Sequence, residues 1–457
     1  MIDEASIVDN FPFTDTGNAE RLVATYGDSF RWLTDEETFA VWDGTVWKKD
    51  PSGNILLPLT KRVIRAMPDA DWSMKSESAM KRKAMITLAK GEEKVFAARE
   101  SFDQRPMLLN VMNGTIDLET EQLREFSRED YLTKKARVTY DAFASAPKFD
   151  QFMRDTFGGD EDLIHYILKA LGYTLTGLIG ESCFFICHGL GQNGKTTLLE
   201  IVMQILGLDY ATVAAATAFM EQKFENGSAE YERASWAGSR LLTNAEPKST
   251  GRLNEDVLKR LSGGEAMKAR VIRQSPFTFY PECKLWLALN KKPRIVGTDD
   301  GIWRRVRFIP FMHKVPDDKK VRDFHKVLFA EEGPGILNRL LEGLSAWQSE
   351  GLKSPSAVAA ATAEFRATSD TLDGFFATRC LTGKHSYWVE CGKLYEAYQQ
   401  WAEDMGEYVM RSQEFSEELD RRQFIKKRGD TGQIRRMITL KDAVNESSPD
   451  TDLFDAA

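Results

Sequence analysis

The sequence of 457 residues predicts an α/β fold in which short apolar strands alternate with helices. Three observations support this. The apolar run Cys183–Cys187 leads into the glycine-bearing loop Gly189–Gly194, and the pattern over 198–202 then begins an amphipathic helix. Two further apolar runs, 240–246 and 283–290, end in polar residues. In a sheet of this type, such strand ends are where ligands bind.

The composition describes an ordinary globular protein. Apolar residues make up 42% of the chain and charged residues 28%, and the length allows two to four domains. The five cysteines are scattered, which favours buried thiols over disulfides or a zinc site. No apolar run approaches the length of a membrane span and no signal peptide is visible, so we expect no membrane association and a cytoplasmic location. With a net charge of −8, binding to nucleic acid would depend on local basic patches.

Residues 1–95 predict a small α+β domain. Residues 14–20 predict a turn and an N-cap that lead into a helix through Leu22, Val23 and Tyr26, and 39–47 predicts a hairpin with an Asp-Gly turn. A second hairpin is expected over 108–118, with a turn at Asn113-Gly114. Residues 147–172 predict helices interrupted at Gly158-Gly159.

The loop before Lys195 fits the pattern G-x-x-x-x-G-K-[ST] between a strand and a helix. Backbone N–H groups and the helix N-terminus can surround a triphosphate, while Lys195 neutralises its outer phosphates and Thr196 holds Mg²⁺. A glycine-rich turn with no ligand is the alternative. The predicted nucleotide-binding residues are Gly189, Gly191, Gln192, Asn193, Gly194, Lys195, Thr196 and Thr197.

Four later residues suit the chemistry of ATP hydrolysis. Glu246 ends an apolar strand about 50 residues after the loop, where a carboxylate can polarise water or support Mg²⁺; an exposed strand-end glutamate is the alternative. Asn290 ends another strand and could orient the attacking water. Arg304 and Arg305 directly precede a strand and could stabilise a transferred phosphoryl group, often from a neighbouring subunit.

Two basic stretches predict contacts with DNA. Residues 252–275 hold six basic and three acidic side chains and read as a basic hairpin. Residues 421–441 hold eight basic and one acidic side chain, arranged as a helix, a basic turn at 426–429 and a strand over 434–440, which suits a helix followed by a wing on duplex DNA. A solvated charged face is the alternative for both. The predicted DNA-binding residues are Lys268, Arg270, Arg273, Lys426, Lys427, Arg428, Arg435 and Arg436.

Five motifs in this order resemble a superfamily 3 helicase motor, and more closely the helicase half of the phage, plasmid and poxvirus primase-helicase family. They are Gly191–Thr197, Arg240–Glu246, Leu261–Glu265 with Ala269-Arg270, Leu289–Ile295 and Asp300–Val306. The resemblance implies a P-loop AAA+-like motor over 148–350, a family-specific domain before it over 96–147 and a winged-helix domain over 365–441. The acidic composition of 442–457 predicts a disordered tail.

The resemblance also implies roles for single residues. ATP and Mg²⁺ would be the cofactors, Glu246 would activate water, Asn290 would sense the γ-phosphate, and Arg305, with Arg304 as second choice, would act on ATP in the adjacent subunit of a hexameric ring. Lys268 and Arg270 would line the central channel and grip single-stranded DNA. Nothing in the first 100 residues supplies the carboxylates or zinc ligands of a primase-polymerase domain, so a separate primase is the expected partner.

The resulting hypothesis is an ATP-dependent replicative DNA helicase that acts on forked DNA for a phage, plasmid or integrated element in a bacterial cytoplasm. A DNA-binding P-loop ATPase that serves as an origin-binding or defence switch, without processive unwinding, shares every motif. A small-molecule kinase would need neither the basic hairpin nor the wing. The tail over 442–457 holds five acidic and no basic residues, and we expect it to compete with DNA for the basic wing.

Overall fold

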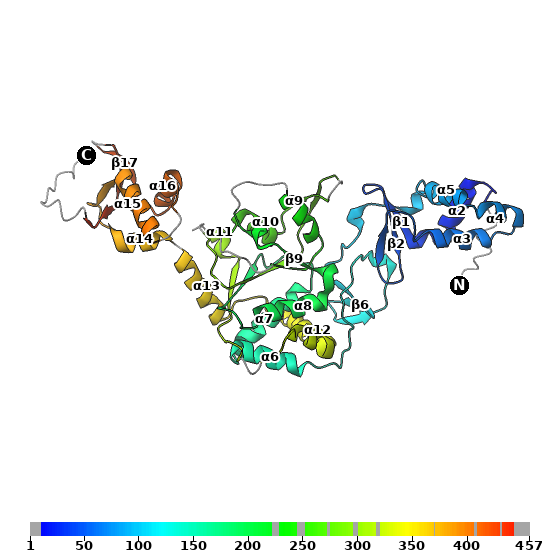
Figure 1. Ribbon diagram of the computed structural model, residues 1–457, viewed down its shortest axis with the longest axis horizontal. Helices are drawn as coiled ribbons and strands as arrows, with labels where there is room; N and C mark the ends of the chain where they lie inside the picture. The colour runs from blue at the N-terminus through cyan, green and yellow to red at the C-terminus, as the bar shows by residue number, and fades with distance from the viewer. Residues whose placement is uncertain are drawn as a thin grey trace. The chain divides into compact units, whose positions relative to one another are not determined.

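The computed structural model describes residues 11–221, 228–244, 252–271, 275–295, 300–316, 320–369, 371–405, 409–429 and 432–442. The chain divides into two compact units, Met1–Thr362 and Ala363–Ala457 (Figure 1). Within these ranges no helix is both long and apolar enough to cross a membrane. Glu246, Arg273 and nearly all of the predicted acidic tail lie outside the described residues.

The first unit begins with a small α+β region. Its sheet has the strand order β3-β2-β1-β4, and its core contains Leu22, Phe30, Ile64 and Met85. The N-cap expected within 14–20 is Thr14, whose hydroxyl accepts a hydrogen bond from the backbone of Gly17, and the helix already begins at Asp15, so the predicted turn is part of it. The elements are α2 (Asp15–Tyr26), β1 (Phe30–Leu33), β2 (Thr38–Trp42), β3 (Trp47–Asp50), α3 (Leu57–Arg65), α4 (Ala70–Ser76), α5 (Ala79–Ala89) and β4 (Phe96–Ala97).

The two predicted hairpins form, but their turns differ from the prediction. Trp42 pairs with Trp47, so the first connection has four residues, and the Asp43 carboxylate accepts hydrogen bonds from the backbone inside it. In the second, β5 (Leu108–Val111) pairs with β6 (Gly114–Asp117), and the turn falls at 112–113. Gly114 already belongs to the strand β6. This position requires glycine, because a Cβ there would lie 2.5 Å from the Arg124 carbonyl of β7 (Gln122–Arg124).

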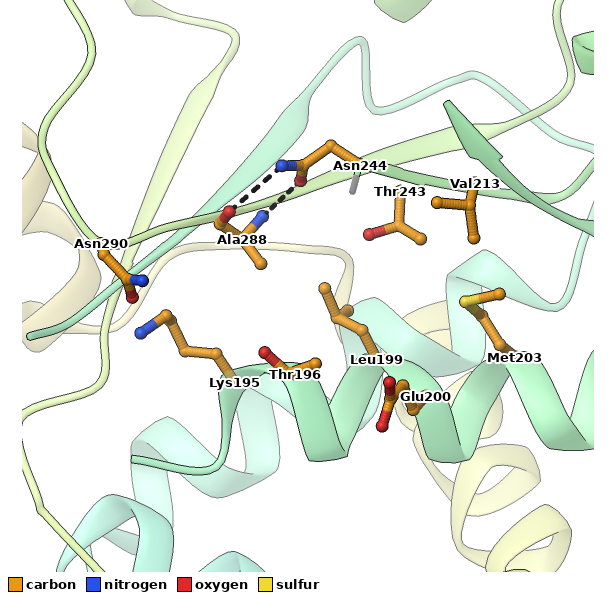
Figure 2. Close-up of a pocket in the computed structure, with 10 residues that line it drawn as sticks. All are labelled: Lys195, Thr196, Leu199, Glu200, Met203, Val213, Thr243, Asn244, Ala288 and Asn290. Carbon is orange, nitrogen blue, oxygen red and sulfur yellow. Dashed lines mark hydrogen bonds between the residues drawn. The ribbon is translucent and has the colours of Figure 1, made fainter. Parts of the chain in front are cut away.

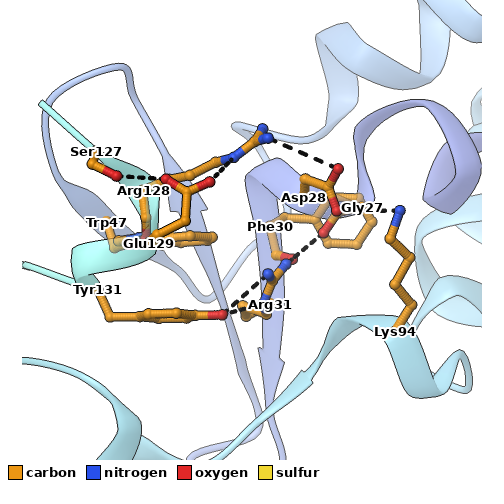
Figure 3. A network of polar contacts seen from close by, with 10 residues as sticks. All are labelled: Gly27, Asp28, Phe30, Arg31, Trp47, Lys94, Ser127, Arg128, Glu129 and Tyr131. Atoms are coloured by element: carbon orange, nitrogen blue, oxygen red, sulfur yellow. Dashed lines mark hydrogen bonds and ion pairs between the residues drawn. The ribbon is translucent and has the colours of Figure 1, made fainter.

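A polar network joins the N-terminal sheet to the segment 127–131 (Figure 3). The ring of Trp47 stacks on that of Tyr131 with centroids 5.5 Å apart, and the Trp47 indole donates to the Arg128 carbonyl at 2.9 Å. Arg31 donates to the Tyr131 hydroxyl at 3.1 and 3.2 Å. The N-terminal region is therefore anchored on the chain that leads into the central sheet.

The central sheet has five parallel strands in the order β14-β8-β13-β10-β9. Because all five are parallel, their carboxyl ends meet at one edge. The strands are β8 (Phe184–His188), β9 (Ala211–Ala214), β10 (Leu241–Asn244), β13 (Lys284–Leu289) and β14 (Val306–Pro310).

Four helices pack together on one side of this sheet: α6 (Pro147–Phe157), α7 (Glu161–Thr174), α8 (Lys195–Tyr210) and α12 (Phe324–Glu350) (Figure 1). The predicted break at Gly158 is confirmed, since this residue ends α6 with a left-handed φ of 63°. Helices α7 and α12 approach closely at two glycines. A Cβ on Gly172 would lie 2.2 Å from a backbone nitrogen of α12, and one on Gly343 would lie 2.1 Å from the Leu168 carbonyl.

The first basic stretch is only partly a hairpin. Lys259 and Arg260 lie on the helix α10 (Glu255–Gly263), while Lys268 lies on β11 (Met267–Ala269), which pairs with β12 (Phe277–Phe279). Arg270 directly follows β11. The predicted hairpin is therefore shorter than the basic stretch, and α10 ends at Gly264 in a left-handed conformation. Two further short helices are α9 (Ser228–Arg233) and α11 (Asp300–Trp303).

The second unit begins within α13 (Ser356–Ser369) and has a core that includes Phe375, Tyr398, Trp401 and Phe415. One three-stranded sheet has the order β16-β18-β17, and β15 pairs with β19. The elements are α14 (Thr371–Arg379), β15 (Cys380–Thr382), β16 (Trp388–Glu390), α15 (Cys391–Asp404), α16 (Ser412–Arg421), β17 (Lys426–Gly429), β18 (Gly432–Arg436) and β19 (Ile438–Leu440).

Two local predictions for this unit are wrong. Residues 426–429 form the strand β17 and not a turn, since they pair with β18. The strand expected over 434–440 is interrupted at Met437, whose φ is 66°. A residue in the left-handed region cannot continue a regular strand, so the chain leaves one sheet and enters the other at this position.

Candidate functional site

The glycine-rich loop leaves β8 at the carboxyl edge of the central sheet. Gly191 and Gly194 adopt φ values of 100° and 82°, and Gln192 one of 55°. Position 189 requires glycine for a steric reason, because a Cβ there would lie 1.8 Å from the side-chain amide nitrogen of Asn193. The Asn193 amide is buried and donates to the Phe311 carbonyl at 2.8 Å, which ties the loop to the chain leaving β14.

Lys195 is the first residue of α8 and is only 4% exposed. Its ammonium group donates to the Gly189 carbonyl and to the Asn193 side-chain oxygen, both at 2.8 Å. These bonds hold a positive charge at the centre of the loop, next to the N-terminus of a long helix. A buried cation at this position favours an anionic ligand.

A cavity of about 250 Å³ lies beside the loop (Figure 2). Lys195, Thr196 and Asn290 lie at one end, and Met203 and Val213 lie at the other. The structure thus brings the predicted Asn290 together with the predicted loop, although the two are far apart in the sequence. The lining residues are Lys195, Thr196, Leu199, Glu200, Met203, Val213, Thr243, Asn244, Ala288 and Asn290.

Asn244 and Glu200 line this cavity and were missed by sequence reasoning. The Asn244 amide bonds the backbone of Ala288 in both directions, accepting at 2.7 Å and donating at 3.2 Å, so it fixes the carboxyl ends of β10 and β13 against each other (Figure 2). The Glu200 carboxylate lies 2.8 Å from the Nδ1 atom of His325. Its spacing of four residues from Thr196 was a signal, since that spacing places both on one helix face.

The residues near the loop suit Mg²⁺ only in combination with phosphate. No group of three or more His, Cys, Asp or Glu side chains that could hold a metal occurs among the described residues. Burial raises the pKa of Cys183 and Cys187 to about 12, so both thiols stay protonated and are poor ligands. The exposed hydroxyl of Thr196 faces the cavity. Mg²⁺ usually takes few protein ligands and completes its shell with phosphate and water, so this site fits.

Arg304 and Arg305 lie at the opposite edge of the sheet. The Arg305 carbonyl accepts a hydrogen bond from Phe184, the first residue of β8, whereas the loop follows His188, the last. With five residues in β8 and a rise of about 3.3 Å per residue, the two edges are roughly 16 Å apart. The Arg305 guanidinium instead donates to the Ser262 hydroxyl at 3.3 Å. Neither arginine lines the cavity.

One predicted DNA contact is wrong. Arg435 is 1% exposed, and its guanidinium bonds Asp420, the Phe424 carbonyl and both oxygens of Ser416. All its donor directions point into the second unit, so it cannot reach a phosphate. The other predicted residues that the structure describes are exposed: Lys268, Arg270, Lys426, Lys427, Arg428 and Arg436.

Comparison with family models gives two matches. Residues 19–158 match a family described as D5 N terminal like, and residues 187–305 match a family of unknown function (DUF5906). A protein named as a helicase in Acanthamoeba polyphaga mimivirus is 27% identical over 297 residues, which are 60% of this chain and 30% of that protein. A protein named as a primase in African swine fever virus is 25% identical over 219 residues, or 46% of this chain and 22% of that protein.

These matches support membership of the primase-helicase family, of the superfamily 3 type. It spans less than a third of the length of these relatives, which also include a protein named as a helicase in Invertebrate iridescent virus 3, 25% identical over 48% of this chain and 24% of that one. The fold resembles the apo structure of the NrS-1 C terminal region, with a TM-score of 0.54 and 9% identity over 93% of this chain and all of that one.

Proposed function

We propose that this primase-helicase is an ATP-dependent DNA helicase whose motor is a P-loop AAA+-like domain and whose second unit is a winged-helix domain. The observation that carries the proposal is the division of the catalytic groups between the two edges of one sheet. The loop, Lys195 and Asn290 share a cavity at the carboxyl edge, whereas Arg305 lies at the amino edge. The proposed motor spans 148–350, and the proposed winged-helix domain spans 365–441.

ATP would bind with its phosphates in the glycine-rich loop. Lys195 would exchange its bonds to Gly189 and Asn193 for bonds to phosphate oxygens, Thr196 would hold Mg²⁺, and Asn290 would face the γ-phosphate. Mg²⁺ would neutralise charge on the β- and γ-phosphates when bound. Glu246 follows β10 closely and is proposed to activate the attacking water.

The position of the arginines supports a closed assembly. Arg305 cannot reach the cavity of its own chain, about 16 Å away by strand rise, but its edge of the sheet can face the cavity of a second copy. A guanidinium supplied from a neighbour stabilises charge on the transferred phosphoryl group. We therefore propose a homo-oligomeric ring, with a hexamer as the expected state, and Arg304 as the second candidate for this role.

DNA would contact the two basic surfaces. Lys268 and Arg270 are exposed on and beside the short hairpin β11–β12, and we propose that they grip single-stranded DNA in the ring. The exposed residues Lys426, Lys427, Arg428 and Arg436 of the second unit would contact DNA at the fork. Basic side chains of this kind bind phosphate without reading sequence.

The test is strand displacement on forked DNA with ATP and Mg²⁺. Wild-type protein should separate the strands, and Lys195→Ala should abolish both hydrolysis and displacement while its melting temperature stays close to that of the wild type. Lys353→Ala, which removes an exposed lysine away from the cavity, is the matched control and should keep full activity. DNA binding with ATP hydrolysis but no displacement would instead support an ATPase switch at origins or in defence.

A further inference from the structure

The outer face of the sheet β16-β18-β17 carries Trp388, which is 55% exposed. It is the one tryptophan among the described residues that is strongly exposed, and its ring stacks on no other aromatic or cationic side chain of the described chain. A large aromatic surface left in water costs free energy, so such a residue often marks a binding site.

The strand register places a cation beside Trp388 and a second apolar side chain beyond that cation. Trp388 is directly opposite Arg436, and the Arg436 backbone N–H bonds the Ile425 carbonyl on the next chain segment at 2.9 Å. Residues directly opposite in an antiparallel pair share one face. Ile434 is two positions before Arg436 on β18, so its side chain is on the same face. Lys427 is directly opposite Ile434 and therefore lies on that face as well. We call Trp388, Arg436, Ile425 and Lys427 the wing face.

The other side of the same sheet is occupied by the protein itself. Val389 and Arg435, the neighbours of Trp388 and Arg436, are buried, and Arg435 bonds residues of α16. Alternation along the strands therefore assigns one cation to the interior and the next to the wing face. The guanidinium of Arg436 and the ammonium of Lys427 make no ion pair with any described side chain.

The chemistry of the wing face fits an unpaired base joined to a phosphate backbone. We propose that it binds single-stranded nucleic acid, with Trp388 stacking on one base and Arg436 and Lys427 contacting the flanking phosphates. Aromatic side chains stack on any base, and cations beside them neutralise the backbone. One acid, Glu390, lies on the same face, since it is opposite Ile434, and its carboxylate is paired with Lys393 at 3.3 Å.

Other occupants fit less well. A base-paired duplex presents phosphates and groove edges, and its bases are already stacked, so it would use the cations and leave the indole without a partner. A protein partner would need a continuous apolar patch, whereas Arg436 separates Trp388 from Ile425 in this row. The wing face would thus hold the strand that unwinding releases, which rests on the proposed helicase function.

The test compares two DNA ligands by fluorescence anisotropy on the full chain without nucleotide. The probes are a labelled oligo-dT strand and a hairpin duplex of similar charge. Trp388→Ala should weaken binding of oligo-dT about tenfold and leave binding of the hairpin unchanged, because stacking of one base is lost. Trp388→Phe, which keeps an aromatic ring, should retain most of the affinity. Arg436→Ala should weaken oligo-dT binding and reduce its dependence on log salt by about one.

Two controls make the result decisive. Phe143→Ala removes another exposed aromatic, 96% exposed, from the first unit and should change neither affinity. Urea midpoints of the second unit should be equal in wild type and Trp388→Ala. Unchanged oligo-dT affinity in Trp388→Ala, or an equal loss for both ligands, overturns the proposal. If Lys195→Ala fails to affect strand displacement, the helicase proposal falls, but the Trp388 result still decides the wing face.

Discussion

Substitution of the adjacent arginines Arg435 and Arg436 in β18 should affect two different properties of the protein. Arg435→Met removes a guanidinium that is 1% exposed and donates to the Ser416 carbonyl and hydroxyl at 2.8 and 2.6 Å, to the Phe424 carbonyl at 2.8 Å and to Asp420. Arg436→Met removes an exposed guanidinium one residue later. We expect the first to destabilise the second unit and the second to weaken DNA binding.

The size of the effect follows from the partners that lose their bonds. Each buried acceptor left without a donor costs about 1–3 kcal/mol, but such costs are not additive. Asp420 contributes little to the loss, since its side chain is 56% exposed and its carboxylate regains water. We expect a net loss of about 2–4 kcal/mol, which would lower the urea midpoint by roughly 1–2 M. Arg436→Met should change stability by less than about 0.5 kcal/mol.

Pulse proteolysis in urea measures the midpoint for the second unit alone if its fragments are followed by mass spectrometry. The measurement belongs at pH 7. Arg435 lowers the pKa of Asp420, so the stability from this pair is complete above the ordinary carboxyl pKa and is lost as the pH falls through the lower folded value. Should Arg435→Met keep the wild-type midpoint and weaken DNA binding as Arg436→Met does, the assignment of Arg435 to the interior is wrong.

Three further predictions concern the first unit and the thiols. Gly189→Ala should abolish ATP binding in a nucleotide-analogue titration, because its methyl group would lie 1.8 Å from a side-chain nitrogen, whereas Gly180→Ala meets nothing within 4 Å and should bind normally. Arg305→Ala should still bind ATP but not hydrolyse it. Mixing it with Lys195→Ala should restore part of the phosphate release, because a mixed assembly can pair an intact Lys195 of one copy with an intact Arg305 of the other. If phosphate release does not recover at any mixing ratio, the two copies do not share a site. With a thiol reagent at pH 8, the half-exposed Cys391 should react in the native protein, while four thiols react only in denaturant, because burial raises the pKa of each to about 12: Cys183, Cys187, Cys283 and Cys380.

The candidate site was largely predictable where chemistry depends on neighbours in the chain. The loop before Lys195 needs glycines at positions that the local pattern reveals, and its strand and helix lie directly on either side. Asn290 was found because a polar residue ending an apolar run marks a strand tip. Asn244 was missed because its role depends on two hydrogen bonds to the backbone of Ala288. Ala288 lies on β13, and only the pairing of β13 with β10 brings it next to Asn244.

By itself, the sequence determined the local conformations of this chain: an N-cap within 14–20, the break at Gly158, the loop before Lys195 and the apolar strands, because each depends mainly on residues nearby in the chain. The tertiary structure alone decided which basic side chains reach solvent and which edge of the sheet each group occupies. Arg435 and Arg436 are adjacent residues of the same type. Strand alternation turns Arg435 toward the helix α16, where it is buried, and leaves Arg436 exposed. Arg305 and Lys195 both flank strands, yet the parallel pairing of β8 with β14 sends them to opposite edges, since it fixes strand direction as well as strand order.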